Sequence, residues 1–462
     1  MCWPHDITRA YTLLPSYITE PDLALSVKEF VTGSAWIGIS EGSSPHSDAE
    51  HATMNSYISE LDLDAKIRRE MLESLTWWRQ RTKLGGKIPQ EDENELHESL
   101  TATITALLLS LCKNVETLYF EDMYRGLLRN YLLASNYGLT SRPALQRLRH
   151  VAFHPTRSFP EDDRWYADID FLNIIRCIHR LPKLESLTME GVAEGEVEDG
   201  EPFPAKTSRG LKRISLRHMD IHPNLLHTIV RIPAGLEELS LSFGGLWAVD
   251  GYGGNLEPAT LGKALRQHKK TLRVLDLDMG SAIISNFIGR WPEEDEEPGY
   301  YDTDNKYYQM DLAEGEMPLY ADQLRDEHET FAIGSLTDYA ALTRLSISIE
   351  AMTVRRFYYS PDTPQLIEKP EYRLINTLPP NLEYLCLYDY EKGKSPRVDG
   401  EVAELMENKS ERFPKLKEIV GVDKPELGVF TDRPDAPRGR RCPEEMLWEW
   451  PEDHLDGTWV EE

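Results

Sequence analysis

The chain has 462 residues, of which 79 are acidic and 51 are basic, and its formal net charge is −28. A chain of this length predicts either several globular domains or one elongated repeat protein. Because so negative a protein is repelled by phosphate backbones and anionic lipid surfaces, we do not expect nucleic acid or membranes among its partners.

We expect residues 1–110 to form an N-terminal cap. The segment PDLALSVKEFVTG places Val27 and Phe30 at the leading apolar positions of a degenerate first repeat. Residues 40–58 are rich in Ser, Asp, Glu and His and predict a mobile loop. Two helices are expected, over about 62–81 and about 95–111, because apolar residues recur there at helical spacing.

From there on, one apolar spacing recurs along the chain. It has the form LxxLxL, as in Leu236, Leu239 and Leu241, and it places the last two leucines on one face of a short strand. A strand of this kind has only half a core, so it is stable only beside further copies. Copies are expected at 115–120, 148–153, 184–189, 211–216, 236–241, 272–277, 342–347, 382–387 and 416–419.

Helical spacing between these strands predicts the connecting elements. Proline or glycine precedes many of the strands, which ends the helix before it and turns the chain. Helices are expected at 168–180, 223–231, 258–268, 321–330 and 401–412. Strand, loop, helix and return make the right-handed parallel unit of a solenoid. The predicted fold class is therefore α/β: an irregular leucine-rich-repeat horseshoe over residues 111–422, with parallel strands on the concave face and helices on the convex face.

Two acidic segments stand apart from the repeats. Leu272 and Leu342 are 70 residues apart, and the insertion at 291–336 lies between them. Its acidic residues and tyrosines fit either a recognition arm that orders on binding or a loop without a partner. Residues 423–462 predict an acidic, Trp-rich tail or a cap on the last repeat.

The concave face is where a binding site is expected. Once the apolar positions point inward, alternation sends the intervening side chains to the open face. Interfaces favour Tyr and Arg, although any solenoid also needs a polar lining on this face. The candidate partner-binding residues are Tyr119, His150, His154, Arg213, Arg217, Asp276, Asp278, Arg344, Tyr384 and Tyr388.

Signatures of catalysis and metal binding are weak. The sequence has no GxSxG elbow, phosphate loop, HExxH pair or GxGxxG after a strand. His150 and His154 would stand about 13 Å apart along a strand, too far to share one ion. We therefore expect no enzyme, no cofactor and no metal. An enzyme would need a pocket with convergent ionisable groups.

The cysteines and the apolar runs indicate the compartment. Five cysteines lie far apart without a CxxC pair, which argues against a disulfide framework and favours a reducing compartment. The N-terminus lacks a basic region followed by an apolar run, and the longest apolar run, Ile104 to Cys112, is far shorter than a membrane span. The sequence predicts a soluble protein of the cytoplasm, the nucleus or both.

The repeats resemble those of the large fungal group of leucine-rich-repeat and F-box-like proteins. The resemblance covers roughly residues 20–422 and is carried by PDLALSVKEF, LLLSLCKNVETLYFED, LPKLESLTMEGV, GLKRISLRHMDI, GLEELSLS, TLRVLDLD, LTRLSISI, LPPNLEYLCLYD and FPKLKEI. Members that work in ubiquitin ligation place an F-box before the first repeat. This chain departs from that pattern, because its first unit begins by residue 21.

These observations together predict a non-catalytic scaffold that binds a protein partner on its concave face. The resemblance implies one alternative, the substrate-recognition subunit of a cullin-type ubiquitin ligase, with a partner supplying the F-box. Co-purification of a cullin adaptor distinguishes the two.

Overall fold

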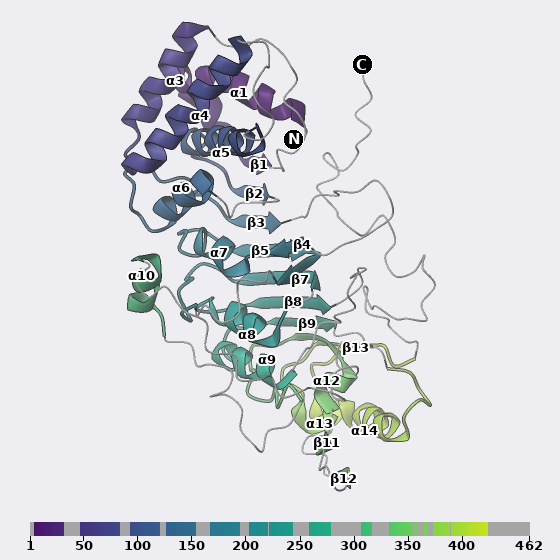
Figure 1. Ribbon diagram of the computed structural model, residues 1–462. Coiled ribbons are helices and arrows are strands. Elements are labelled where there is room, and N and C mark those ends of the chain that lie inside the picture. Colours follow the sequence, from purple (N-terminus) through teal and green to yellow (C-terminus); the bar gives the residue numbers. More distant parts are fainter. Residues whose placement is uncertain are drawn as a thin grey trace. The chain divides into compact units, whose positions relative to one another are not determined.

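The computed structural model shows a mixed α/β protein in which most strands are parallel (Figure 1). The described residues are 4–31, 47–83, 93–120, 126–153, 167–194, 203–219, 221–243, 258–278, 306–316, 332–353, 357–358, 365–366, 373–388 and 390–423. They fall into two compact units, one of 4–153 with 172–185 and one of 167–171 with 186–423.

The first unit is mostly helical and has a short parallel sheet. Helix α5 packs against α1, α4 and α6, and β2 pairs with both β1 and β3. Its elements are α1 (Pro4–Thr19), α2 (Pro21–Leu25), β1 (Glu29–Val31), α3 (Asp48–Glu60), α4 (Ala65–Lys83), α5 (Glu93–Leu111), β2 (Thr117–Phe120), α6 (Gly126–Asn136), β3 (His150–Phe153) and, from Leu172 onward, α7 (Phe171–Arg176).

The second unit contains a parallel sheet in the order β5-β7-β8-β9-β10-β13-β14. Two smaller pairs, β4 with β6 and β11 with β12, lie outside it. The elements are β4 (Ala167–Ile169), β5 (Ser186–Glu190), β6 (Val192–Glu194), β7 (Arg213–Met219), α8 (Pro223–Arg231), β8 (Glu238–Phe243), α9 (Pro258–Leu265), β9 (Val274–Asp278), α10 (Lys306–Glu314), β10 (Arg344–Ser348), α12 (Ile349–Thr353), β11 (Phe357–Tyr358), β12 (Gln365–Leu366), α13 (Leu374–Thr377), β13 (Tyr384–Tyr388), α14 (Pro396–Arg412) and β14 (Glu418–Val420).

The apolar positions of the repeats form the core of this sheet. Register pairs each inner residue with its counterpart on the next strand, as Leu239 pairs with Ile214 and Leu275. All three are at most 2% exposed, and burying one such side chain contributes about 1.5–3 kcal/mol. The LxxLxL spacing therefore sets both the strand and its register, since a slip of one residue would turn every leucine to the other face.

Strands lie at all nine predicted positions, and β1 lies in the degenerate first repeat. The helix expected at 223–231 has those bounds, and those expected near 62–81 and 95–111 are α4 and α5. The other helix ends differ by a few residues: α7 is shorter than 168–180, α9 continues as a 3-10 turn (Arg266–His268), and α14 begins at Pro396. The helix expected at 321–330 lies outside the described residues, and so does the tail after Asp423.

The expectation of a loop over 40–58 is wrong for its second half, because α3 spans Asp48–Glu60. Ser47 accepts a hydrogen bond from the Glu50 amide while the Glu50 carboxylate accepts one from the Ser47 amide, so a capping box starts the helix. His51, Met54 and Ile58 then form its buried side. The polar composition of this segment concealed both signals.

Candidate functional site

One face of the second unit's sheet carries the side chains between the core positions, and we refer to it as the polar face. Cross-strand register aligns these side chains in rows. The amino-terminal row contains Ser186, Arg213, Glu238, Val274, Arg344, Tyr384 and Glu418. The central row contains Thr188, Ser215, Ser240, Asp276, Ser346, Cys386 and Val420.

Asp276 is the centre of a hydrogen-bond network on this face. The Tyr388 hydroxyl donates to Asp276 Oδ1 at 2.9 Å, and the Ser240 hydroxyl donates to Oδ2 at 3.4 Å. Tyr388 belongs to β13, which is separated from β9 by β10. The phenol can cross β10 because that strand presents the small Ser346 opposite Asp276.

Burial governs the ionisation of this pair. It raises the pKa of the Asp276 carboxyl, while the hydrogen bonds from Tyr388 and Ser240 and the charge of Arg217 partly offset the effect. The pKa of Tyr388 is also raised, first by burial and then by the neighbouring Asp276. The phenol is therefore a permanent donor at neutral pH, and the carboxylate is an acceptor held at some cost in solvation.

An arginine and a tyrosine stack beside this network. The guanidinium carbon of Arg344 lies 4.7 Å from the centroid of the Tyr384 ring, within the range of a cation–π contact. Arg344 is exposed and Tyr384 is half-buried. The stack gives the polar face a side-chain platform that is ordered before any partner arrives.

The sequence-predicted residues are only partly brought together. Seven of them lie on the polar face of the second unit: Arg213, Arg217, Asp276, Asp278, Arg344, Tyr384 and Tyr388. Tyr119 on β2 and His150 on β3 belong to the first unit, where both are half-exposed. His154 lies outside the described residues.

Asp278 is not a surface residue, contrary to its prediction as a partner-binding residue. It is 5% exposed, and the nearby Ser242 and Ser348 are 6% and 2% exposed. Alternation determines the face from which a side chain leaves a strand, but it does not determine whether another part of the chain covers it. The accessible part of the polar face is thus its amino-terminal row, the central row apart from the buried Cys386, and the side chains of Arg217 and Tyr388.

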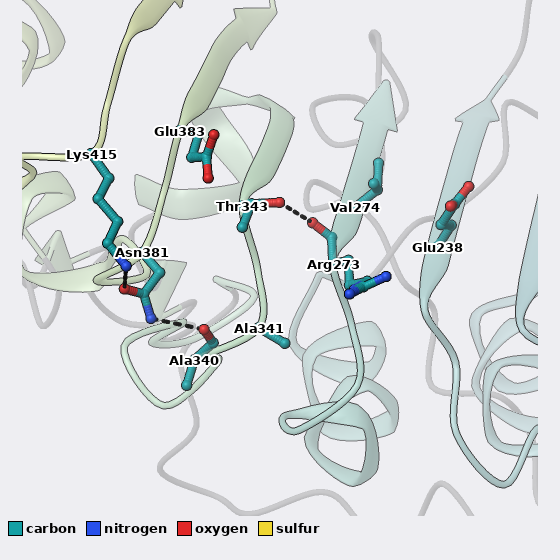
Figure 2. Close-up of a pocket in the computed structure, with 9 residues that line it drawn as sticks. All are labelled: Glu238, Arg273, Val274, Ala340, Ala341, Thr343, Asn381, Glu383 and Lys415. Carbon is teal, nitrogen blue, oxygen red and sulfur yellow. Dashed lines mark hydrogen bonds between the residues drawn. The ribbon is translucent and has the colours of Figure 1, made fainter.

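The structure also shows a pocket that the sequence did not predict. It has a volume of about 520 Å³ and lies at the amino-terminal ends of the strands (Figure 2). Its lining residues are Glu238, Arg273, Val274, Ala340, Ala341, Thr343, Asn381, Glu383 and Lys415. The polar-face alternation misses most of them, because they precede the strands.

Comparison with known proteins gives no match: no family model, no curated protein and no solved structure is significantly similar to the chain. Among the described residues, no group of three His, Cys, Asp or Glu side chains is arranged to hold a metal ion. No helix in the same residues has the length and apolarity needed to cross a membrane.

Replacing Asp276 with asparagine is expected to stabilise the protein at pH 7. The amide keeps an acceptor for Tyr388 but removes the buried charge. Because the folded-state pKa is raised, the wild-type carboxyl contributes stability that is present below its unfolded pKa and lost as pH rises through the folded pKa. The difference in urea midpoint between Asp276→Asn and wild type should therefore shrink as pH falls toward 4. A less stable variant at pH 7 would mean that the hydrogen bonds outweigh the solvation cost.

Proposed function

We propose that the chain is a leucine-rich-repeat solenoid whose polar face is the concave surface, and that this surface binds a protein partner without catalysis. The fold proposal is supported by the recurrence of the LxxLxL spacing, with an apolar residue at each position, at β5, β7, β8, β9, β10 and β13 of the parallel sheet, and by helices α8 and α9, which connect neighbouring strands. The functional proposal draws on the chemistry of the exposed rows.

The observation that carries the binding proposal is the pre-ordered arrangement of arginine and tyrosine on one sheet face. Arg344 is stacked on Tyr384, and Tyr388 is fixed by Asp276. Arginine and tyrosine are enriched among the few residues that carry most of the binding energy at protein interfaces. Side chains already held in place lose less conformational entropy on binding, which leaves more of the contact energy as affinity. Arg217 is exposed on the same face and adds a charged contact.

Reversing the charge at Arg213 and Arg217 should abolish partner capture without unfolding the chain. Both lie on β7, and neither contributes to the apolar core. Replacing interface arginines with residues of the opposite charge is expected to weaken binding at least 30-fold, which is about 2 kcal/mol. The measurement is quantitative mass spectrometry of proteins recovered with tagged full-length chain from its native cells.

The matched control reverses two exposed arginines on helical segments, Arg266 and Arg412. Proteins that bind the polar face are those recovered with wild type and with Arg266→Glu/Arg412→Glu, but lost with Arg213→Glu/Arg217→Glu. If the same proteins are recovered with all three chains, the binding site is elsewhere.

The resemblance to F-box-like proteins supports a second proposal, substrate recognition for a cullin-type ubiquitin ligase. It uses the same polar face, which would then hold the substrate. A cullin adaptor among the recovered proteins, together with a separate protein containing an F-box, would favour it over a free-standing scaffold.

A further inference from the structure

The residues immediately before the strands of the repeats form a row of mostly charged side chains, which we call the charge ladder. In the first unit they are Lys28, Glu116, Arg149 and Glu185, and in the second unit they are Lys212, Glu237, Arg273, Thr343, Glu383 and Lys417. Within each unit, backbone hydrogen bonds link consecutive positions, as from the Arg273 amide to the Glu237 carbonyl at 2.7 Å. Their side chains are therefore held side by side.

Charge alternates along the ladder, and most neighbours form ion pairs. In the first unit Lys28 pairs with Glu116 at 3.0 Å and Arg149 with Glu185 at 2.9 Å. In the second unit Lys212 pairs with Glu237 at 2.8 Å and Lys417 with Glu383 at 2.7 Å. Opposite charges directly across neighbouring strands stabilise a sheet, and like charges destabilise it.

Thr343 is the one neutral position of this ladder, and it leaves Arg273 poorly paired. The ion pair of Arg273 in the described structure is with Glu237, at 4.0 Å. Glu237 is held more closely by Lys212. The Thr343 hydroxyl donates to the Arg273 carbonyl and does not engage its side chain, which is 67% exposed.

The pocket in Figure 2 lies at this break in the ladder. The small side chains of Ala340 and Ala341 form part of its wall. Lys415 is a second cation on its border, and its ammonium donates to the neutral Asn381 Oδ1 at 2.8 Å. Within the described part of the chain, Lys415 forms no ion pair.

The two acids of the pocket do not neutralise these cations. Glu383 forms an ion pair with Lys417. The hydrogen bond and charge of Lys417, together with the charge of Lys415, hold the pKa of Glu383 below its usual range. Glu238 is exposed at the other end of the pocket, on the strand next to Arg273. The strongly negative remainder of the chain is screened over roughly 8–10 Å at physiological salt.

We infer that this pocket binds carboxylates of an acidic peptide segment, with Arg273 holding one carboxylate and Lys415 another. Arginine presents paired N–H donors that match a carboxylate. Lys415 precedes β14, three strand spacings or about 14 Å from β9, and its ammonium contacts Asn381, which precedes β13, two spacings or about 10 Å from β9. Acids three to four residues apart in an extended peptide therefore reach both cations. Both cations lie before the strands and outside the polar face, although the pocket shares Glu238 and Val274 with the amino-terminal row of that face.

The test measures fluorescence anisotropy of a labelled, acetylated and amidated peptide with glutamates four residues apart, titrated with full-length chain. Binding is expected to weaken about ten-fold when glutamine replaces glutamate in the peptide, and about five-fold for Arg273→Gln or Lys415→Gln, the upper range of a surface ion pair. Glu238→Gln should strengthen binding. A peptide whose only carboxylate is its C-terminus distinguishes a terminal carboxylate from acidic side chains.

The decisive variant introduces a negative charge at Thr343, the neutral position of the ladder. Thr343→Glu places a carboxylate beside Arg273 and should remove peptide binding, whereas Thr343→Gln, of the same size, should retain it. Thr343 is half-exposed, and circular dichroism checks that both variants fold. Equal binding by the glutamate and glutamine peptides, or unchanged binding by Thr343→Glu, would overturn the inference.

Discussion

Acidification from pH 7 to pH 4 is expected to destabilise the second unit strongly through two buried histidines. Burial lowers the pKa of His227 and of His268 from 6.5 to about 4 each, with backbone hydrogen bonds opposing the shift. A pKa lowered on folding means that the unfolded chain takes the proton first. Stability is therefore complete above about pH 6.5 and is lost as pH falls toward 4 and below, on the order of 3 kcal/mol for each histidine.

The hydrogen bonds of His268 give this expectation a geometric basis. Its Nδ1 accepts from the Leu236 amide at 3.0 Å, and its Nε2–H donates to the Val230 carbonyl at 2.8 Å. One ring in its neutral form thus links the end of α8 to the first leucine of the next repeat. Protonation of Nδ1 would make it a donor facing the Leu236 amide, which is also a donor. It would also leave a charge on a side chain that is 0% exposed.

Urea unfolding between pH 7.5 and pH 4.5 measures the effect. His268→Gln should be less stable than wild type at pH 7.5, and its stability should depend less steeply on pH. His150→Gln serves as the control, because His150 is half-exposed on β3. Hydrogen exchange should show the loss of protection at low pH in α8, β8 and β9. An equally steep pH dependence in the His227→Gln/His268→Gln chain would contradict the assignment.

Replacing Gly262 with alanine should lower the free energy of unfolding by about 3 kcal/mol. Gly262 lies in α9, where a Cβ atom would come 1.9 Å from the carbonyl oxygen of Ile333. That carbonyl is backbone, and the Ile333 amide is itself bonded to the Ala351 carbonyl, so the neighbour has little room to move. Overpacking of this kind costs about 1–3 kcal/mol or more.

Gly400 provides a matched control for this substitution. It lies in α14, and a Cβ atom built there meets nothing within 4 Å. Gly400→Ala should therefore stabilise the protein by up to about 1 kcal/mol through helix propensity alone. Opposite signs of the two changes in thermal and urea unfolding would show that the approach of Ile333 to α9 determines the Gly262 effect. A stabilising Gly262→Ala would contradict the close packing.

The repeats could be predicted because two signals agree: the period of the apolar residues and the positions of the helix-breaking residues. Leu239 and Leu241 alternate as a strand requires, and the proline or glycine before many of the strands marks where they begin. Helix α3 was missed because its buried side contains His51 and Met54 in a polar segment. Its capping box corresponds to Ser47 and Glu50 in the sequence, three residues apart, and this spacing is the signal that predicts the start of the helix.

The site was less predictable because it depends on contacts distant in sequence. Asp276 and Tyr388 were both identified as candidates, but their hydrogen bond joins residues 112 positions apart. It requires β10 between them to carry a serine. The neutral Thr343 becomes informative only when the strands are aligned, because 70 positions separate it from Arg273. The pairing register between strands determines these contacts, and it cannot be predicted from any single segment of the sequence.

Site-specific photo-crosslinking in native cells tests the central proposal most directly. A benzophenone side chain at Ser215, half-exposed between Arg213 and Arg217 on β7, reports contacts of the polar face. The same group at Met406, 44% exposed on α14, reports contacts of that helix. We expect a protein adduct from Ser215 that disappears with Arg217→Glu, and none of the same identity from Met406. Adducts from Met406 with none from Ser215 would contradict binding on the polar face.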